Sequence, residues 1–205
     1  MAKILIAYDE KDKSLGDFFL ECKSHIAQYF KSKDISITEL GSSQLNDLAI
    51  YLCINHLPQF IFGAYSHGDD NSLLKAADVE YVSIMKNGSA FKGGFVYTFS
   101  CSSGKELGRD LVGVNQCQCF IGYSKPVFIW TNFFPPFVEC ANHGLIQFFD
   151  GSDTLTALNA MKKKYNDEID KMYEINPLVA ASLVDNRKAL IMHGNNICLK
   201  DFEGN

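Results

Sequence analysis

Two short stretches of the sequence each place a reactive side chain directly after an apolar run. Residues 60–64 lead to His67 and Gly68, and residues 95–99 lead to Cys101. Such runs, rich in β-branched and aromatic residues and bounded by glycine or serine, predict short buried strands. A thiol and an imidazole are the parts of a cysteine nucleophile with its general base. The pattern therefore indicates nucleophilic catalysis, with Cys101 as the nucleophile and His67 as the base.

The residues around Cys101 and His67 offer what a thiolate nucleophile needs. The pKa of a reactive thiol is lowered by a nearby imidazole or a helix N-terminus, and Ser102–Gly104 predict a turn into a helix whose amides approach Cys101. The backbone N–H groups of Gly68 and Cys101 are candidate donors to the oxyanion of a tetrahedral intermediate. The alternative is that Cys101 is a core cysteine and His67 a loop histidine. Their joint placement favours catalysis.

Strands and helices are expected to alternate along the chain. The predicted strands are residues 3–8, 35–40, 60–64, 95–100, 119–123 and 189–193, with a weaker pattern for a short strand at residues 81–84. The predicted helices are residues 14–32, 43–57, 105–112, 135–150, 153–172 and 177–184. This alternation predicts one α/β domain over residues 1–205, with a doubly wound, mainly parallel six-stranded sheet and helices on both faces. Reactive groups in such sheets collect beyond the carboxyl ends of parallel strands, where Cys101 and His67 fall.

Composition and charge exclude several classes of function. The chain of 205 residues has a formal net charge of −5 and no basic stripe interleaved with aromatic residues, so nucleic acid is not an expected partner. No apolar run approaches the roughly 18–20 residues of a membrane span, and the first run is too short for a signal peptide. The seven cysteines are odd in number and lack a disulfide spacing. We therefore expect a cytoplasmic protein that does not bind membranes.

The two reactive stretches together resemble the catalytic blocks of the caspase-like (clan CD) cysteine peptidases, which include metacaspases and CHAT-domain proteases. Residues 64–68 are similar to the block in which a hydrophobic strand leads to His-Gly, and residues 98–104 are similar to the cysteine block. The order, histidine before cysteine, is also the family's order. Residues 105–127 resemble the CHAT segment in which a helix is followed by a strand and a substrate-pocket loop.

The resemblance implies a caspase-like fold and a cysteine endopeptidase with a Cys101–His67 dyad. It implies a protein or peptide substrate, no cofactor and no metal. It also implies a domain that stays latent until an activating protein or small ligand binds. A role in regulated proteolysis or in bacterial, including antiviral, defence belongs to the same expectation.

Substrate preference does not carry over from the family. Phe99 stands where metacaspases have an acidic residue, and neither motif holds an arginine, so no basic or aspartate P1 preference is implied. Asp69 and Asp70 attract a basic substrate residue in one interpretation and are solvated loop charges in the other. Ser66 and Ser124 complete the predicted substrate-binding residues.

A nucleotide-binding or sensor domain without peptidase activity is the main alternative. Residues 3–8, followed by the charged loop 9–13, also resemble the opening of flavodoxin-like and TIR-like domains. Ser102–Lys105 at a helix start is a potential phosphate site. That alternative predicts tight binding of a flavin or nucleotide. Cys117 and Cys119 lack a second pair at zinc-like spacing, so no metal is expected there.

Overall fold

The computed structural model describes residues 3–202, which fold around a six-stranded sheet in the order β2-β1-β3-β7-β8-β9. Neighbouring strands are parallel except for β9, which runs antiparallel to β8 at one edge. The strands are β1 (Lys3–Tyr8), β2 (Thr38–Leu40), β3 (Phe60–Tyr65), β7 (Phe95–Phe99), β8 (Cys119–Tyr123) and β9 (Leu190–Gly194). The prediction of a mainly parallel six-stranded sheet is confirmed.

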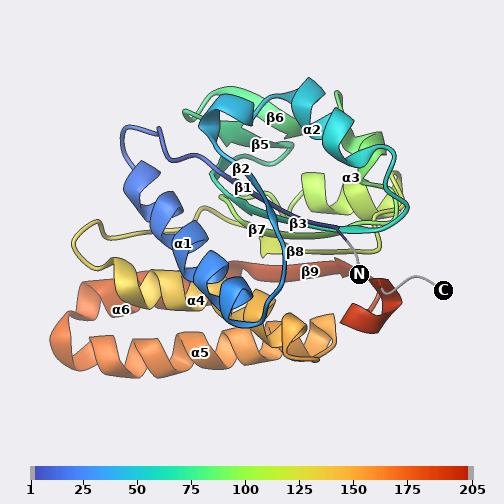
Figure 1. The fold of residues 1–205 in the computed structure, drawn as a ribbon. Helices are drawn as coiled ribbons and strands as arrows, with labels where there is room; N and C mark the ends of the chain where they lie inside the picture. Colours follow the sequence, from blue (N-terminus) through green and yellow to red (C-terminus); the bar gives the residue numbers. More distant parts are fainter. Residues whose placement is uncertain (1–2, 203–205) are drawn as a thin grey trace.

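Helices cover both faces of this sheet (Figure 1). One face packs against α1 (Gly16–Ser32), α4 (Phe134–Phe149), α5 (Thr154–Ile175) and α6 (Pro177–Ala189). The other face packs against α2 (Asp47–Ile54) and α3 (Leu107–Gly113). Short 3-10 helices lie at η1 (Ser42–Gln44), η2 (Gly88–Phe91) and η3 (Leu199–Phe202). Within residues 3–202, no helix combines the length and the apolar character needed to cross a bilayer.

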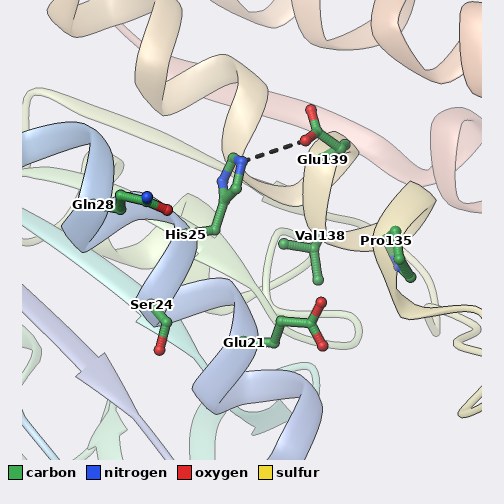
Figure 2. Close-up of a pocket in the computed structure, with 7 residues that line it drawn as sticks. All are labelled: Glu21, Ser24, His25, Gln28, Pro135, Val138 and Glu139. Atoms are coloured by element: carbon green, nitrogen blue, oxygen red, sulfur yellow. Dashed lines mark ion pairs between the residues drawn. The ribbon is translucent and has the colours of Figure 1, made fainter. Parts of the chain in front are cut away.

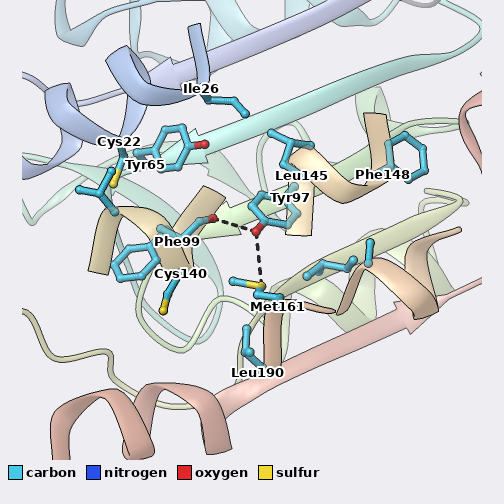
Figure 3. Packing of buried hydrophobic residues seen from close by; sticks show 14 of the residues in the cluster. Cys22, Ile26, Tyr65, Tyr97, Phe99, Cys140, Leu145, Phe148, Met161 and Leu190 are labelled. Atoms are coloured by element: carbon cyan, nitrogen blue, oxygen red, sulfur yellow. Dashed lines mark hydrogen bonds between the residues drawn. The ribbon is translucent and has the colours of Figure 1, made fainter. Parts of the chain in front are cut away.

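The alternation of side chains along β3 and β7 divides the core into two layers. Ile61 and Tyr65 face α1 and α4, whereas Phe60 and Phe62 face α2 and α3. This is the period of two that a strand imposes. On the α1 side, the Tyr97 hydroxyl donates a hydrogen bond of 2.7 Å to the Ala141 carbonyl and lies 3.4 Å from Met161 Sδ (Figure 3). The strands that carry the reactive residues are therefore fixed from both sides.

A second, three-stranded antiparallel sheet lies between β3 and β7 in the sequence. It consists of β4 (His67–Gly68), β5 (Ser72–Lys75) and β6 (Val79–Ser83). The sequence predicts only one short strand in this region, at residues 81–84, because small and polar residues weaken the pattern from 69 to 94. The hairpin matters for the site because its first strand contains His67 and Gly68.

Two helix boundaries differ from the prediction in a way that affects the site. The helix expected from residue 105 begins at Leu107, after turns at residues 101–106. The helix expected to end near residue 184 continues to Ala189. Its extra turn contains Asn186, whose side chain is fully buried.

Candidate active site

His67 and Cys101 follow neighbouring parallel strands at the same register position. In the ladder between β3 and β7, Tyr65 pairs with Phe99, so His67 and Cys101 each lie two residues beyond a paired residue. The hydroxyls of Ser66 and Ser100, which lie 3.5 Å apart, continue this register past the strand ends. Because neighbouring strands are separated by about 4.8 Å, the register brings the two backbones side by side.

The imidazole of His67 lies between α1 and the loop that follows β1. The ring of Phe19 stands almost perpendicular to it, with the two ring centroids 5.5 Å apart. His67 Nε2 is buried and lies 3.1 Å from Asp12 Oδ2. The approach is not aligned as a hydrogen bond, and catalytic contacts of this kind often align only when substrate binds. This contact leaves Nδ1 as the nitrogen that does not face Asp12.

Hydrogen bonds from the loop that contains Asp12 keep its side chain ionised. Its Oδ1 accepts hydrogen bonds from the Ser14 N–H (2.9 Å), the Ser14 hydroxyl (2.7 Å) and the Leu15 N–H (2.7 Å). Burial alone raises the pKa of this carboxyl. The bonds from Ser14 and Leu15, together with His67, outweigh that effect and lower the pKa to about 2. A group with this pKa is ionised at neutral pH and favours a proton on His67 Nε2.

Sequence reasoning missed Asp12 as a site residue, although a signal was present. The charged loop 9–13 follows β1, and β1 pairs with β3 directly. Carboxyl ends of adjacent parallel strands meet at one edge of a sheet. Applying that rule to β1 as well as to β3 and β7 places an acidic residue beside His67.

The thiol of Cys101 is half-buried and contacts the chain after β8. The Val127 N–H donates to Cys101 Sγ at 3.4 Å, and the Val127 carbonyl oxygen lies 3.9 Å from the sulfur. Burial raises the pKa of Cys101, and the hydrogen bond from Val127 offsets this only in part. The resting protein therefore holds a neutral thiol at pH 7.

The turn after Cys101 does not bring helix amides to the thiol, which corrects the prediction for Ser102–Gly104. The Ser102 N–H donates to the Lys125 carbonyl (3.1 Å), and the Gly104 N–H donates to the Tyr123 carbonyl (2.8 Å). Ser102 has a φ of +54°, a conformation uncommon for a residue with a side chain. The N–H groups of Ser102 and Gly104 are therefore already hydrogen-bonded to backbone carbonyls, whereas those at a helix start are free to bind a negative charge. They do not stabilise a thiolate at Cys101, so α3 does not activate this residue.

The main chain at Gly68 fits against the Cys101 segment without room for a side chain. A Cβ at this position would lie 2.9 Å from the Cys101 carbonyl oxygen and 3.0 Å from Ser100 Cβ. The Asp69 N–H donates to the Ser72 carbonyl (3.0 Å), which makes Gly68 and Leu73 the next, non-hydrogen-bonded pair of the hairpin. In such a pair the N–H points away from the partner strand, so the Gly68 N–H is not used by β5.

The other predicted substrate-binding residues are not brought together in one cleft. Ser66 is buried on the opposite face from His67, where its hydroxyl lies 2.7 Å from the Tyr81 hydroxyl. Asp69 Oδ1 accepts hydrogen bonds within its own turn, from the N–H groups of Asn71 (2.8 Å) and Ser72 (2.7 Å).

Asp70 and Ser124 are tied to neighbouring segments. Asp70 pairs with Lys105, and its carbonyl accepts the N–H of Leu107 at 2.8 Å. The hydroxyl of Ser124 donates to the Ala189 carbonyl at 3.1 Å. These contacts give both residues a role in fixing loops, and their role toward a substrate stays a prediction.

A surface pocket of about 290 Å³ lies elsewhere, between α1 and α4 (Figure 2). His25 Nε2 lies 3.4 Å from Glu139 Oε1 in this pocket. His25 Nδ1 lies 3.1 Å from the amide nitrogen of the buried Asn142, which also bonds to Tyr65. Neither Cys101 nor His67 lines this pocket. Within residues 3–202, no group of three or more His, Cys, Asp or Glu side chains is placed to bind a metal ion.

The fold defines a class: a mixed α/β domain with the caspase-like arrangement of a six-stranded, mainly parallel sheet between helices. It is similar to the Arg-specific cysteine proteinase gingipain R, with a TM-score of 0.57 and 11% sequence identity over 95% of this chain and 46% of that chain. The complex of the Porphyromonas gingivalis RgpB pro- and mature domains gives a TM-score of 0.57 and 10% identity over 95% and 47%. No protein-family model and no curated protein matches the sequence. The chain spans about half the length of these structural neighbours.

Proposed function

We propose that this chain is a cysteine endopeptidase in which Cys101 is the nucleophile and His67 the general base. The observation that carries the proposal is the shared register position of these two residues at the ends of β3 and β7, in a fold similar to that of a cysteine proteinase. Asp12 adds the third component, because it faces His67 Nε2 at 3.1 Å. A base oriented by a carboxylate is the arrangement that a weak nucleophile requires.

The proposed reaction divides into an acylation and a hydrolysis. With the Nε2 proton of His67 directed to Asp12, Nδ1 accepts the proton of the Cys101 thiol, and the thiolate attacks the peptide carbonyl carbon. The N–H groups of Gly68 and Cys101 stabilise the oxyanion that forms. When the intermediate collapses, the C–N bond breaks and His67 donates its proton to the leaving amine. Water, deprotonated by His67, then hydrolyses the thioester and regenerates the thiol.

The contact between Cys101 and Val127 supports a latent resting state as part of this proposal. A neutral thiol bonded to the Val127 N–H is not an activated nucleophile. Activity then requires that a substrate, an activating protein or a small ligand breaks this contact. We assign the activity to regulated proteolysis, with bacterial defence as the setting that the caspase-like resemblance suggests.

The nucleotide-binding alternative has less support from the geometry. Three of the amides expected to hold a phosphate, those of Ser102, Gly104 and Lys105, donate to backbone carbonyls. The side chain of Lys105 pairs with Asp70. A phosphate would have to displace these internal bonds.

The decisive experiment incubates the wild-type chain with a proteome-derived peptide library and identifies new N-termini by mass spectrometry. We expect cleavage that is lost in Cys101→Ala and His67→Ala and retained in Cys198→Ala, a matched change at a half-buried thiol of the C-terminal segment. Cleavage that persists in Cys101→Ala contradicts the proposal. An inert wild-type protein that copurifies with a nucleotide or flavin favours the alternative.

A further inference from the structure

Residues 126–130, which we call the flanking segment, have the form of a strand without a neighbouring strand. Val127 and Ile129 pack against the core, whereas Phe128 and Trp130 are 51% and 38% exposed. This alternation is that of a half-buried β-strand. No strand pairs with the flanking segment among the residues that the structure describes.

On one edge of the flanking segment, a single side chain from α6 forms the backbone hydrogen bonds that a neighbouring strand would otherwise form. The Phe128 N–H donates to Asn186 Oδ1 at 2.8 Å, and Asn186 Nδ2 donates to the Phe128 carbonyl at 2.7 Å. The carboxamide thereby reproduces the donor and acceptor that a neighbouring strand would present. Asn186 is 0% exposed, so the packing of α6 fixes its position.

The opposite edge faces the candidate nucleophile. Peptide groups of successive residues in an extended chain point to opposite edges, so those of Val127 and Ile129 point away from Asn186. The Val127 N–H confirms this direction, since it lies 3.4 Å from Cys101 Sγ. Within residues 3–202, no hydrogen bond uses the N–H or the C=O of Ile129. An edge that no neighbouring strand covers is a template for an extended peptide.

We propose that Asn186 is a positioning residue for the peptidase reaction: by holding both polar groups of Phe128, it turns the Val127–Ile129 edge toward Cys101 and so aligns the substrate main chain. This inference rests on the proposed peptidase function. Asn186 does not touch the reacting atoms. Its contribution lies in peptide binding and alignment, and the intrinsic reactivity of the thiol toward a small reagent does not depend on it.

A second contact between α6 and the flanking segment supplies a matched control. Trp130 Nε1 donates to the Ser182 hydroxyl at 2.9 Å, one helical turn before Asn186. This bond is exposed and involves a side chain of the segment, so it does not orient the peptide groups. Ser182→Ala therefore removes a contact between the same two elements without affecting the edge.

The experiment compares wild type, Asn186→Ala, Asn186→Asp and Ser182→Ala. Asn186→Asp keeps the size of the side chain and the acceptor for the Phe128 N–H but loses the donor to its carbonyl. Three quantities are measured: kcat and KM for the library peptide that wild type cleaves best, the rate of Cys101 alkylation by iodoacetamide, and amide hydrogen exchange at Phe128. Melting temperatures identify any variant that fails to fold. If Asn186→Ala does not fold, the comparison is made between wild type and Asn186→Asp.

We expect KM to rise about tenfold or more in Asn186→Ala, the order expected for two lost hydrogen bonds, with a smaller change in kcat. Alkylation of Cys101 should stay within about twofold, exchange at Phe128 should accelerate about tenfold, and Asn186→Asp should be intermediate. Wild-type kinetics in both Asn186 variants, or an equal KM effect in Ser182→Ala, overturns the inference and leaves the peptidase proposal intact. A wild-type protein with no Cys101-dependent cleavage overturns both.

Discussion

The carboxylate of Asp12 lies 3.1 Å from Nε2 of His67, although Asp12 lies in the loop after β1 and His67 lies in β4, just beyond β3. The strands β1 and β3 are hydrogen-bonded neighbours in the sheet. The contact determines which nitrogen of His67 is available as a base. It also gives the candidate dyad a third component whose removal has a defined chemical consequence.

Replacing Asp12 by Asn should abolish most catalysis while the loop stays folded. The amide oxygen is able to keep the bonds from Ser14 and Leu15, but its NH₂ group then donates to His67 Nε2 and moves the imidazole proton to Nδ1. An imidazole with that proton does not accept one from Cys101. We expect kcat/KM to fall by about 10²–10⁴, the range found for general-base catalysis. Asp17→Asn, an exposed carboxylate on α1, should have no effect; equal activity in both variants contradicts the assigned role of Asp12.

The same carboxylate should make stability depend on acid pH. The pKa of Asp12 is lowered from 3.8 to about 2 in the folded chain, so its ionised form stabilises the fold above pH about 4. That contribution is lost as the pH falls from about 4 to about 2. Asp12→Asn should therefore lower the free energy of unfolding by about 1–2 kcal/mol at pH 7, with a smaller difference from wild type at pH 3. Urea unfolding at the two pH values measures this, and a constant difference would refute it.

A methyl group at Gly68 should damage both the fold and the site. A Cβ there would lie 2.9 Å from the Cys101 carbonyl oxygen, which is backbone and unable to rotate away. We expect Gly68→Ala to cost about 1–3 kcal/mol of unfolding free energy and to displace the proposed oxyanion donor. Gly113→Ala is the control, because no atom lies within 4 Å of its added Cβ. Activity and stability equal to those of the control would show that the close approach is not required.

The thiol of Cys101 should react slowly at neutral pH in the resting protein. Since burial raises its pKa, the thiolate is a minor species, and alkylation by iodoacetamide should accelerate about tenfold per pH unit between pH 6 and 8. The rate is followed by mass spectrometry of the modified Cys101 peptide, with Cys53 as an internal half-buried reference. A plateau below pH 7 would mean that His67 already holds a thiolate without substrate.

Local sequence was sufficient to predict the sheet and the two reactive strand ends. The runs at residues 3–8, 60–64, 95–100 and 119–123 are apolar because each strand is covered on both faces, and β-branched and aromatic residues mark them. Histidine and cysteine after two such runs predict adjacent strand ends, because parallel strands share a carboxyl edge. The ladder between β3 and β7 confirms this register, while the catalytic roles of Cys101 and His67 stay predictions.

The tertiary structure alone decided which distant side chains lie against His67 and against the flanking segment beside Cys101. Asp12 lies 55 positions from His67 in the sequence, and Asn186 lies 85 positions from Cys101. No local sequence pattern links such distant positions. Strand order brings the loop after β1 to His67, and the packing of α6 sets Asn186 against Phe128. The start of α3 also depends on distant segments, since the carbonyls of Tyr123, at the end of β8, and of Lys125 accept the N–H groups of Gly104 and Ser102. Side-chain periodicity reports burial, whereas these contacts depend on how distant segments pack.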